Sequence, residues 1–278
     1  MTFSIVARSA DGGSWGVAVA SKFLAVGSAV PAASAGVGAI ATQAAANVAY
    51  KRAGLAMLQD GATAEAALQR LLADDQGREE RQVGIVDAAG RAASRTGSAC
   101  LDWAGGVTGA GYAIQGNILT GQEVVAAMES AWRGSMPEEP LARRLLAALA
   151  AGDAAGGDSR GRQSAALLVV SRGAGYGGLD DTAVDLRVDD HPAPVEELAR
   201  LLELNDLYLT ASTAAERMPV TPELRAELDR GAAAIGARDF ASWVGTENYE
   251  MRVADDISWI DQRVLSIFRA RVTGDRGA

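Results

Sequence analysis

The chain has 278 residues, of which 49% are hydrophobic and 22% are charged, a composition typical of a globular protein with a large core. Its formal net charge of -9, without any local basic stripe, argues against a nucleic-acid partner. A single cysteine, Cys100, and a single histidine, His191, exclude an internal disulfide framework, a cysteine-based zinc cage and an imidazole-rich metal site. We therefore expect no metal and no other cofactor.

The sequence also lacks the patterns of a membrane or exported protein. No basic segment followed by an apolar segment opens the chain, and no run of about eighteen apolar residues occurs in it. We expect a soluble cytoplasmic protein without a membrane partner.

Groups of strands and groups of helices are visible in the sequence pattern of the first 208 residues. Tight-turn residues in "SADGGS" join the first two β-prone segments, and apolar residues three and four apart mark the helices. The expected strands are Thr2–Arg8, Trp15–Ser21, Val37–Gln43, Arg81–Asp87, Arg91–Gly97, Gly111–Leu119, Ser164–Ser171 and Ala183–Asp190. The expected helices are Asn47–Gly61, Thr63–Asp75, Gly121–Gly134, Glu138–Gly152 and Ala193–Leu209.

This order places strands together in hairpins and helices in pairs between them. Hairpins favour antiparallel pairing, whereas a doubly wound parallel sheet needs single strands that alternate with helices. The sequence therefore predicts an α+β fold in which two mainly antiparallel sheets have helices outside them.

The sequence changes in character after about residue 208. Residues 209–278 are mostly helical in pattern, contain more tryptophan and show little strand signal. We expect a main domain over 1–208 and a small helical module over 209–278. An extension packed on the main domain explains the same pattern equally well.

Thr2 is the strongest candidate for chemistry. If Met1 is removed, Thr2 carries a nucleophilic hydroxyl beside a free α-amine, whose usual pKa of about 7.7 to 8.0 suits a general base. The small side chain at position two suits methionine removal. An ordinary threonine at the start of a strand is the alternative.

Lys22 ends the strand that pairs with this segment. With a three-residue loop at Asp11–Gly13, the ladder brings Thr2 opposite Lys22, whereas a two-residue loop shifts the pairing by one position. A nearby ammonium group lowers the proton affinity of the amine and favours attack by the hydroxyl. The alternative is a solvated lysine at a strand end.

Several segments together resemble a known family. "MTFSIVAR", "GVAVASKF", "GVGAIATQAAAN", "YAIQGNIL", "GGDSRGRQSAALLVV" and "VDLRVDDHP" follow one another in the order seen in the family catalogued as domain of unknown function 1028. The resemblance extends over about 2–208. This family is grouped with the N-terminal nucleophile (Ntn) hydrolases. The resemblance implies a four-layer αββα sandwich in which an N-terminal Thr, Ser or Cys cleaves amide bonds.

The resemblance also implies roles for individual residues. Thr2 matches the nucleophile, and Lys22 is similar to the lysine that proteasome-type members hold beside it. Asn117, at a strand end, is similar to the asparagine with which superfamily amidases stabilise an oxyanion, and Gln43 and Asn47 are alternative donors. A turn or helix-cap contact is the other interpretation of each of these amides.

The glycine-rich segment "GGDSRGRQS" supplies further candidates. Asp158, Arg160 and Arg162 are expected at the edge of a substrate pocket, because glycines permit close backbone approach and arginine can bind a carboxylate with two hydrogen bonds. A mobile solvated loop is the alternative. Residues 209–278 resemble a peptidoglycan-binding module sometimes found behind this domain.

Two functions remain open on the sequence alone. The first is an N-terminal-threonine amidohydrolase that acts on a small amide or cyclic amide through an acyl-enzyme intermediate. The second is a non-catalytic binding protein whose C-terminal module recruits a partner or a cell-wall fragment. For either function we expect a homo-oligomer with a small-molecule ligand.

Overall fold

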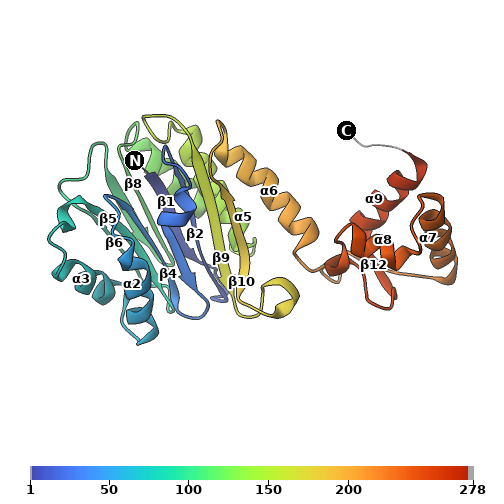
Figure 1. Ribbon diagram of the computed structural model, residues 1–278. Coiled ribbons are helices and arrows are strands. Elements are labelled where there is room, and N and C mark those ends of the chain that lie inside the picture. The colour runs from blue at the N-terminus through green and yellow to red at the C-terminus, as the bar shows by residue number, and fades with distance from the viewer. Residues whose placement is uncertain (1, 275–278) are drawn as a thin grey trace. The chain divides into compact units, whose positions relative to one another are not determined.

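The computed structural model describes residues 2–274 and divides the chain into two compact units (Figure 1). The first unit extends to Leu201 and the second begins at Leu202. The division therefore falls inside the helix α6 (Pro194–Tyr208), a few residues before the expected boundary at 208. Leu207, in the last turn of α6, packs into the core of the second unit, which accounts for the difference.

The first unit contains two antiparallel sheets. The six-stranded sheet has the order β10-β9-β2-β1-β8-β7, and the four-stranded sheet has the order β3-β4-β5-β6. The six strands are β1 (Thr2–Arg8), β2 (Ser14–Ser21), β7 (Gly105–Gly109), β8 (Tyr112–Asn117), β9 (Ser164–Ser171) and β10 (Thr182–Val188). The four strands are β3 (Pro31–Ser34), β4 (Gly38–Ala44), β5 (Arg81–Asp87) and β6 (Ala92–Thr96).

Helices cover the outer faces of both sheets and make four layers. The helices α4 (Glu123–Gly134) and α5 (Leu141–Ala154) pack on the six-stranded sheet, and α2 (Ala49–Gln59) and α3 (Ala64–Ala73) pack on the four-stranded sheet (Figure 1). A short helix α1 (Val26–Ala29) joins β2 to β3. The predicted α+β sandwich with mainly antiparallel sheets is confirmed.

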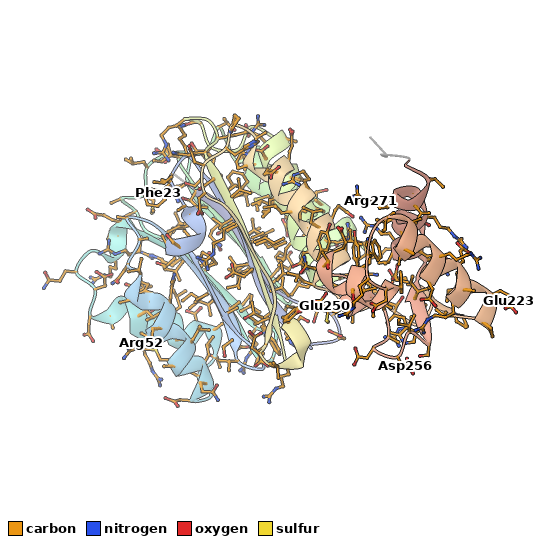
Figure 2. The ribbon with its side chains drawn as sticks, turned by 45° about the vertical axis from the view of Figure 1, so that its right-hand side comes forward. Phe23, Arg52, Glu223, Glu250, Asp256 and Arg271 are labelled. Carbon is orange, nitrogen blue, oxygen red and sulfur yellow. The ribbon has the colours of Figure 1, made fainter. Side chains whose placement is uncertain are left out.

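Apolar side chains fill the space between the two sheets (Figure 2). Val6, Val17 and Val19 of one sheet pack with Ala39 and Val86 of the other in one buried cluster. Burying such side chains stabilises the fold by about 25 cal/mol per Å² of apolar surface. At one end of the same space the buried side chains are polar, and the candidate site lies there.

The second unit is helical with a two-stranded ribbon. Its elements are β11 (Arg217–Pro219), α7 (Pro222–Ala234), α8 (Phe240–Thr246), β12 (Trp259–Asp261) and α9 (Gln262–Thr273). It has its own core, in which Phe240, Trp243 and Phe268 contact one another at ring-centroid distances of 4.7 to 5.6 Å. Within residues 2–274, no helix is long and apolar enough to span a membrane.

Candidate functional site

Thr2 begins the strand β1, and its side chain lies in the space between the two sheets. It faces Asn117 of β8 in the strand register. Its Oγ1 lies 3.1 Å from Oγ of Ser21, the last residue of β2. Thr2 as a whole residue is 6% exposed and is therefore buried. Because β1 has hydrogen-bonded partners on both edges, the backbone of Thr2 is firmly placed.

The first hairpin does not have the register of a three-residue loop, but one that is shifted from it by one position. Phe3 pairs with Ala20, and the N–H of Ser9 donates to the carbonyl oxygen of Ser14 at 2.9 Å. The loop therefore has four residues instead of three, and it is stabilised by Asp11, whose Oδ1 accepts hydrogen bonds from the hydroxyl of Ser9 and the N–H of Gly13. A one-residue shift exchanges the residue that faces a given partner.

This shift brings Ser21, and not Lys22, beside the Thr2 hydroxyl. Lys22 is exposed and follows the end of β2. Its backbone N–H donates to Oδ2 of Asp158 at 2.7 Å. Lys22 is thus close to Thr2 along the chain, but the structure does not place its ammonium group on the Thr2 hydroxyl.

Asn117 and Gln43 both reach Thr2 through its carbonyl oxygen. Nε2 of Gln43 donates to that oxygen at 3.1 Å, and Nδ2 of Asn117 lies 3.5 Å from it. Both amides also donate at 2.8 Å to one acceptor, Oε1 of Gln82. The structure therefore brings two of the three predicted amide donors to Thr2, where they bind its backbone.

Gln82, Gln115 and Ser4 complete this cluster and were not predicted. Nε2 of Gln115 donates to Oγ of Ser4 at 2.6 Å, and Oγ of Ser4 donates to Gln43 at 2.6 Å. Each of these side chains is fully buried. One sequence signal could have found the glutamines, because each lies in a strand that is otherwise mostly apolar, in "IATQ", "RQVGIV" and "YAIQ".

Asn47, the third predicted donor, belongs to a different cluster. Its Nδ2 donates to Oδ2 of Asp75 at 3.2 Å, and its Oδ1 accepts from the N–H of Ala49 at the start of α2. Asp75 also binds Tyr50 at 2.6 Å and Arg81 at 2.9 Å. The hydrogen bond from Arg81 holds the pKa of Asp75 well below its usual range, and burial together with the hydrogen bond to Asp75 raises the pKa of Tyr50.

The glycine-rich loop packs beside the Thr2 end of the six-stranded sheet. The N–H of Ser159 donates to the carbonyl oxygen of Ile118, one residue after Asn117, at 3.2 Å. Asp158 is buried and accepts hydrogen bonds from the N–H groups of Lys22 and Arg160. It therefore ties the loop after β2 to the loop before β9.

The two predicted arginines bind carboxylates of the same chain. The guanidinium of Arg160 lies 3.3 Å from Asp158, and that of Arg162 lies 2.8 Å from Asp153 of α5. The ion pair with Asp153 raises the pKa of Arg162. Each guanidinium thus has a carboxylate partner within the chain.

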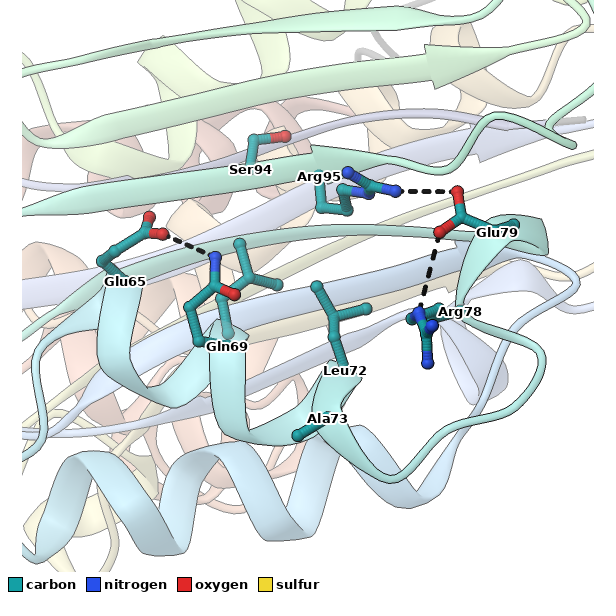
Figure 3. Close-up of a pocket in the computed structure, with 9 residues that line it drawn as sticks. Glu65, Gln69, Leu72, Ala73, Arg78, Glu79, Ser94 and Arg95 are labelled. Carbon is teal, nitrogen blue, oxygen red and sulfur yellow. Dashed lines mark hydrogen bonds and ion pairs between the residues drawn. The ribbon is translucent and has the colours of Figure 1, made fainter.

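A pocket of about 630 Å³ lies elsewhere, between α3 and β6 (Figure 3). It contains none of the predicted site residues. Among the described residues, no group of three or more His, Cys, Asp or Glu side chains is placed to hold a metal ion. The arrangement around Thr2 thus offers hydroxyl and amide chemistry.

Comparison with known proteins identifies the family. Residues 2–198 match a sequence family described as a family of unknown function, DUF1028. The chain belongs to this family. A crystal structure of a DUF1028 protein from Silicibacter pomeroyi is similar to the chain, with 35% sequence identity and a TM-score of 0.66. The similarity covers 74% of this chain and 89% of that one. No curated protein matches the chain.

The DUF1028 match begins at Thr2 and includes every residue of the cluster around it. The unit that begins at Leu202 lies beyond the matched residues. The candidate site therefore belongs to the DUF1028 part of the chain.

Proposed function

We propose that this DUF1028 protein is an Ntn-type hydrolase that cleaves amide bonds with the hydroxyl of Thr2 after removal of Met1. One observation carries the proposal. Thr2 starts a central strand, and its hydroxyl lies between the sheets at 3.1 Å from Ser21, with Asn117 opposite. The Ser21 hydroxyl at this distance can donate a hydrogen bond to Thr2 Oγ1 as Oγ1 loses its proton.

In the proposed reaction, the α-amine of Thr2 takes the proton of Oγ1 directly or through a water molecule. Oγ1 forms a bond to the carbonyl carbon of a small amide or cyclic amide, and the carbon–nitrogen bond then breaks. The proton passes from the α-amine to the leaving nitrogen. Water hydrolyses the acyl ester and restores the hydroxyl.

Asn117 is the proposed oxyanion donor. Its contact with the Thr2 carbonyl oxygen is long, at 3.5 Å, whereas its contact with Gln82 is 2.8 Å. The weaker contact is the one that a developing oxyanion can replace. Lys22 and Asp158 then act on the site through the backbone of the loop after β2, because Asp158 binds the N–H of Lys22.

The first test is the intact mass of the protein purified from cells without an N-terminal tag. A mass lower by one methionine residue is expected, and retention of Met1 contradicts the proposal. The processed protein is then screened against a library of amides and cyclic amides. In any hydrolysis found, Thr2→Ala lowers kcat/KM by at least about a thousandfold. Thr182→Ala, which changes an exposed threonine of β10, serves as the control and leaves the rate unchanged.

One observation favours the second function, a non-catalytic binding protein. The side-chain amides of Gln43 and Asn117 both donate hydrogen bonds to Gln82, so these groups next to Thr2 have partners within the chain. In this alternative the unit from Leu202 recruits a partner or a cell-wall fragment. Full activity of Thr2→Ala, or no hydrolysis by a processed protein, favours this function. For either function we propose a cytoplasmic protein that forms a homo-oligomer. Sedimentation analysis of the purified protein tests the oligomeric state.

A further inference from the structure

Backbone groups fix the orientation of the Gln82 side-chain amide. Its Nε2 lies 2.7 Å from the carbonyl oxygen of Gly116 and 3.2 Å from that of Gly105. A carbonyl oxygen accepts hydrogen bonds and cannot donate them, so the NH2 end of the amide must face these two groups. The reversed amide would place oxygen against oxygen. Oε1 of Gln82 therefore faces Asn117 and Gln43.

This orientation determines how the amides of Asn117 and Gln43 lie. Oε1 of Gln82 is 2.8 Å from Nδ2 of Asn117 and 2.8 Å from Nε2 of Gln43. Because this oxygen can only accept, both neighbouring amides must present their NH2 ends to it. All three side chains are buried, so water cannot replace a lost partner. The backbone carbonyl groups thus set the donors beside Thr2 through Gln82.

Each NH2 group has a second N–H for the site. Gln43 uses it on the Thr2 carbonyl oxygen at 3.1 Å, whereas Nδ2 of Asn117 lies 3.5 Å from the same oxygen. The second N–H of Asn117 is therefore weakly bound. Asn117 faces Thr2 in the strand register, and side chains of directly paired residues lie on one face of a sheet. This N–H is the one that can turn to an oxyanion formed at Thr2.

Gln82 acts on the site from the opposite sheet. It lies in β5 of the four-stranded sheet, whereas Thr2 and Asn117 belong to the six-stranded sheet. Backbone pairing within the six-stranded sheet places Thr2 against Asn117. A change in the Gln82 amide can therefore turn the side chain of Asn117 while both backbones keep their register.

We propose that Gln82 is a positioning residue that orients the Asn117 amide toward the oxyanion of the reaction at Thr2. This inference rests on the proposed hydrolysis. Oε1 of Gln82 keeps one N–H of Asn117, and the other N–H moves from the Thr2 carbonyl oxygen to the oxyanion as its charge develops. Because this contact forms only as the transition state is approached, its loss lowers kcat and leaves KM nearly unchanged.

The variant Gln82→Glu tests this role, because it keeps the length of the side chain and makes its donor depend on pH. In the protonated form, the carboxyl C=O accepts from both amides and the O–H donates to Gly116. In the ionised form, an oxygen without a proton faces the carbonyl oxygens of Gly116 and Gly105, and repulsion turns it from its place. Burial disfavours this charge and raises the pKa of the new carboxyl above its usual value of about 4.3.

The substrate for this test is an amide that the library screen identifies, and kcat and KM are measured between about pH 5 and pH 9. Dividing kcat of Gln82→Glu by that of the wild type at each pH removes the titration of the Thr2 α-amine. The ratio is expected to be highest at low pH and to fall by about a hundredfold as the new carboxyl ionises, with KM nearly unchanged. A ratio that stays constant with pH overturns the proposal.

NMR spectra at each pH restrict the comparison to conditions in which both proteins are folded. If Gln82→Glu is folded only at low pH, it is compared there with Gln82→Met, which has a similar length and no oxygen acceptor. Gln82→Glu is then expected to keep a kcat about a hundredfold above that of Gln82→Met. Equal kcat values overturn the proposal.

A double variant tests whether Gln82 acts through Asn117. When Gln82→Glu is added to Asn117→Ala, the ratio of kcat to that of Asn117→Ala alone is expected to stay constant with pH, because no amide remains to be oriented. A ratio that falls as steeply as in the wild-type background contradicts the positioning role. Hydrolysis that Thr2→Ala abolishes, together with a constant ratio for Gln82→Glu alone, overturns this inference and leaves the proposed function intact. No hydrolysis by the processed wild type overturns both.

Discussion

At the scale of single residues, Gln82 connects the cluster around Thr2. Its Oε1 accepts hydrogen bonds from Gln43 and Asn117, and its Nε2 donates to the Gly116 carbonyl oxygen at 2.7 Å and to the Thr96 hydroxyl at 2.9 Å. The side chain is fully buried. Because each partner is buried or half-buried, removal of Gln82 leaves several polar groups without partners and without water.

We predict that Gln82→Leu lowers the free energy of unfolding by at least about 3 kcal/mol, since each buried unsatisfied polar group costs about 1–3 kcal/mol. Urea unfolding at pH 7 measures this change. Gln69→Leu is the control, because Gln69 is exposed on α3 and bonds to Glu65 at 2.8 Å. It changes stability by no more than about 0.5 kcal/mol. Similar losses for both variants would show that the buried network contributes little.

The sequence predicts the neighbours of Thr2 only in part. Asn117 and Gln43 could be named because an amide at a strand end is visible in the sequence. Ser21 could not, because the choice between Ser21 and Lys22 depends on one residue in the hairpin loop, and turn residues such as Asp11 fit loops of several lengths. Its place in an apolar strand marks Gln82 as a buried polar residue, but no local pattern encodes which residues of the other sheet it contacts.

At the scale of elements, the central strands are predictable, whereas two of the edge strands, β3 and β7, are not. The strands β1, β2, β5 and β9 are rich in β-branched and other apolar residues. The bounds predicted for these strands agree with the structure within one residue. The sequence of β3, "PAAS", has no β-branched residue, that of β7, "GGVTG", is mostly glycine, and both strands are sheet edges. These two strands form because a neighbouring strand offers backbone hydrogen bonds. Their own β-propensity therefore does not predict them.

The turn between α3 and β5 gives a prediction at this scale. Asp75 accepts hydrogen bonds from Arg81, Tyr50 and Asn47, and its pKa in the folded protein is well below the ordinary value of 3.8. A carboxylate with a lowered pKa stabilises the fold fully above its unfolded pKa, and this contribution is lost as the pH falls below about 4. Asp75→Asn is expected to lower the free energy of unfolding at pH 7 by about 1–3 kcal/mol.

Urea unfolding of the wild type and the variant between pH 7 and pH 2 checks this effect. The stability difference between the two proteins should shrink as the pH falls below about 4, because the Asp75 carboxyl group of the unfolded wild type becomes protonated. Asp74→Asn, at the exposed neighbouring position, is the control and shows little difference at either pH. A stability difference for Asp75→Asn that stays constant with pH contradicts the role of the charge.

At the scale of the whole molecule, the chain has two separate sets of buried side chains. The first unit buries its core between two sheets and beneath helices, and the second buries an aromatic cluster of its own. The second core also encloses an ion pair, Arg252 to Asp261 at 2.7 Å, in which Asp261 accepts a further hydrogen bond from Ser212 at 2.6 Å. Burying either charged group without its partner would be costly. The contacts among Arg252, Asp261 and Ser212 therefore favour one particular packing of this unit.

Separate cores predict separate responses to mutation. Phe240 is fully buried between Trp243 and Phe268, so Phe240→Ala should destabilise the second unit by about 3–5 kcal/mol. Hydrogen exchange of the full-length protein, read by mass spectrometry, is expected to lose protection in peptides from residues 210–274 and to keep it in β1, β2 and β8. Ile114→Ala, which empties part of the first core, is expected to give the reverse pattern. A uniform loss of protection across both units in either variant would mean that the two cores unfold as one, and the proposal that the second unit acts as an attached module would lose its structural basis.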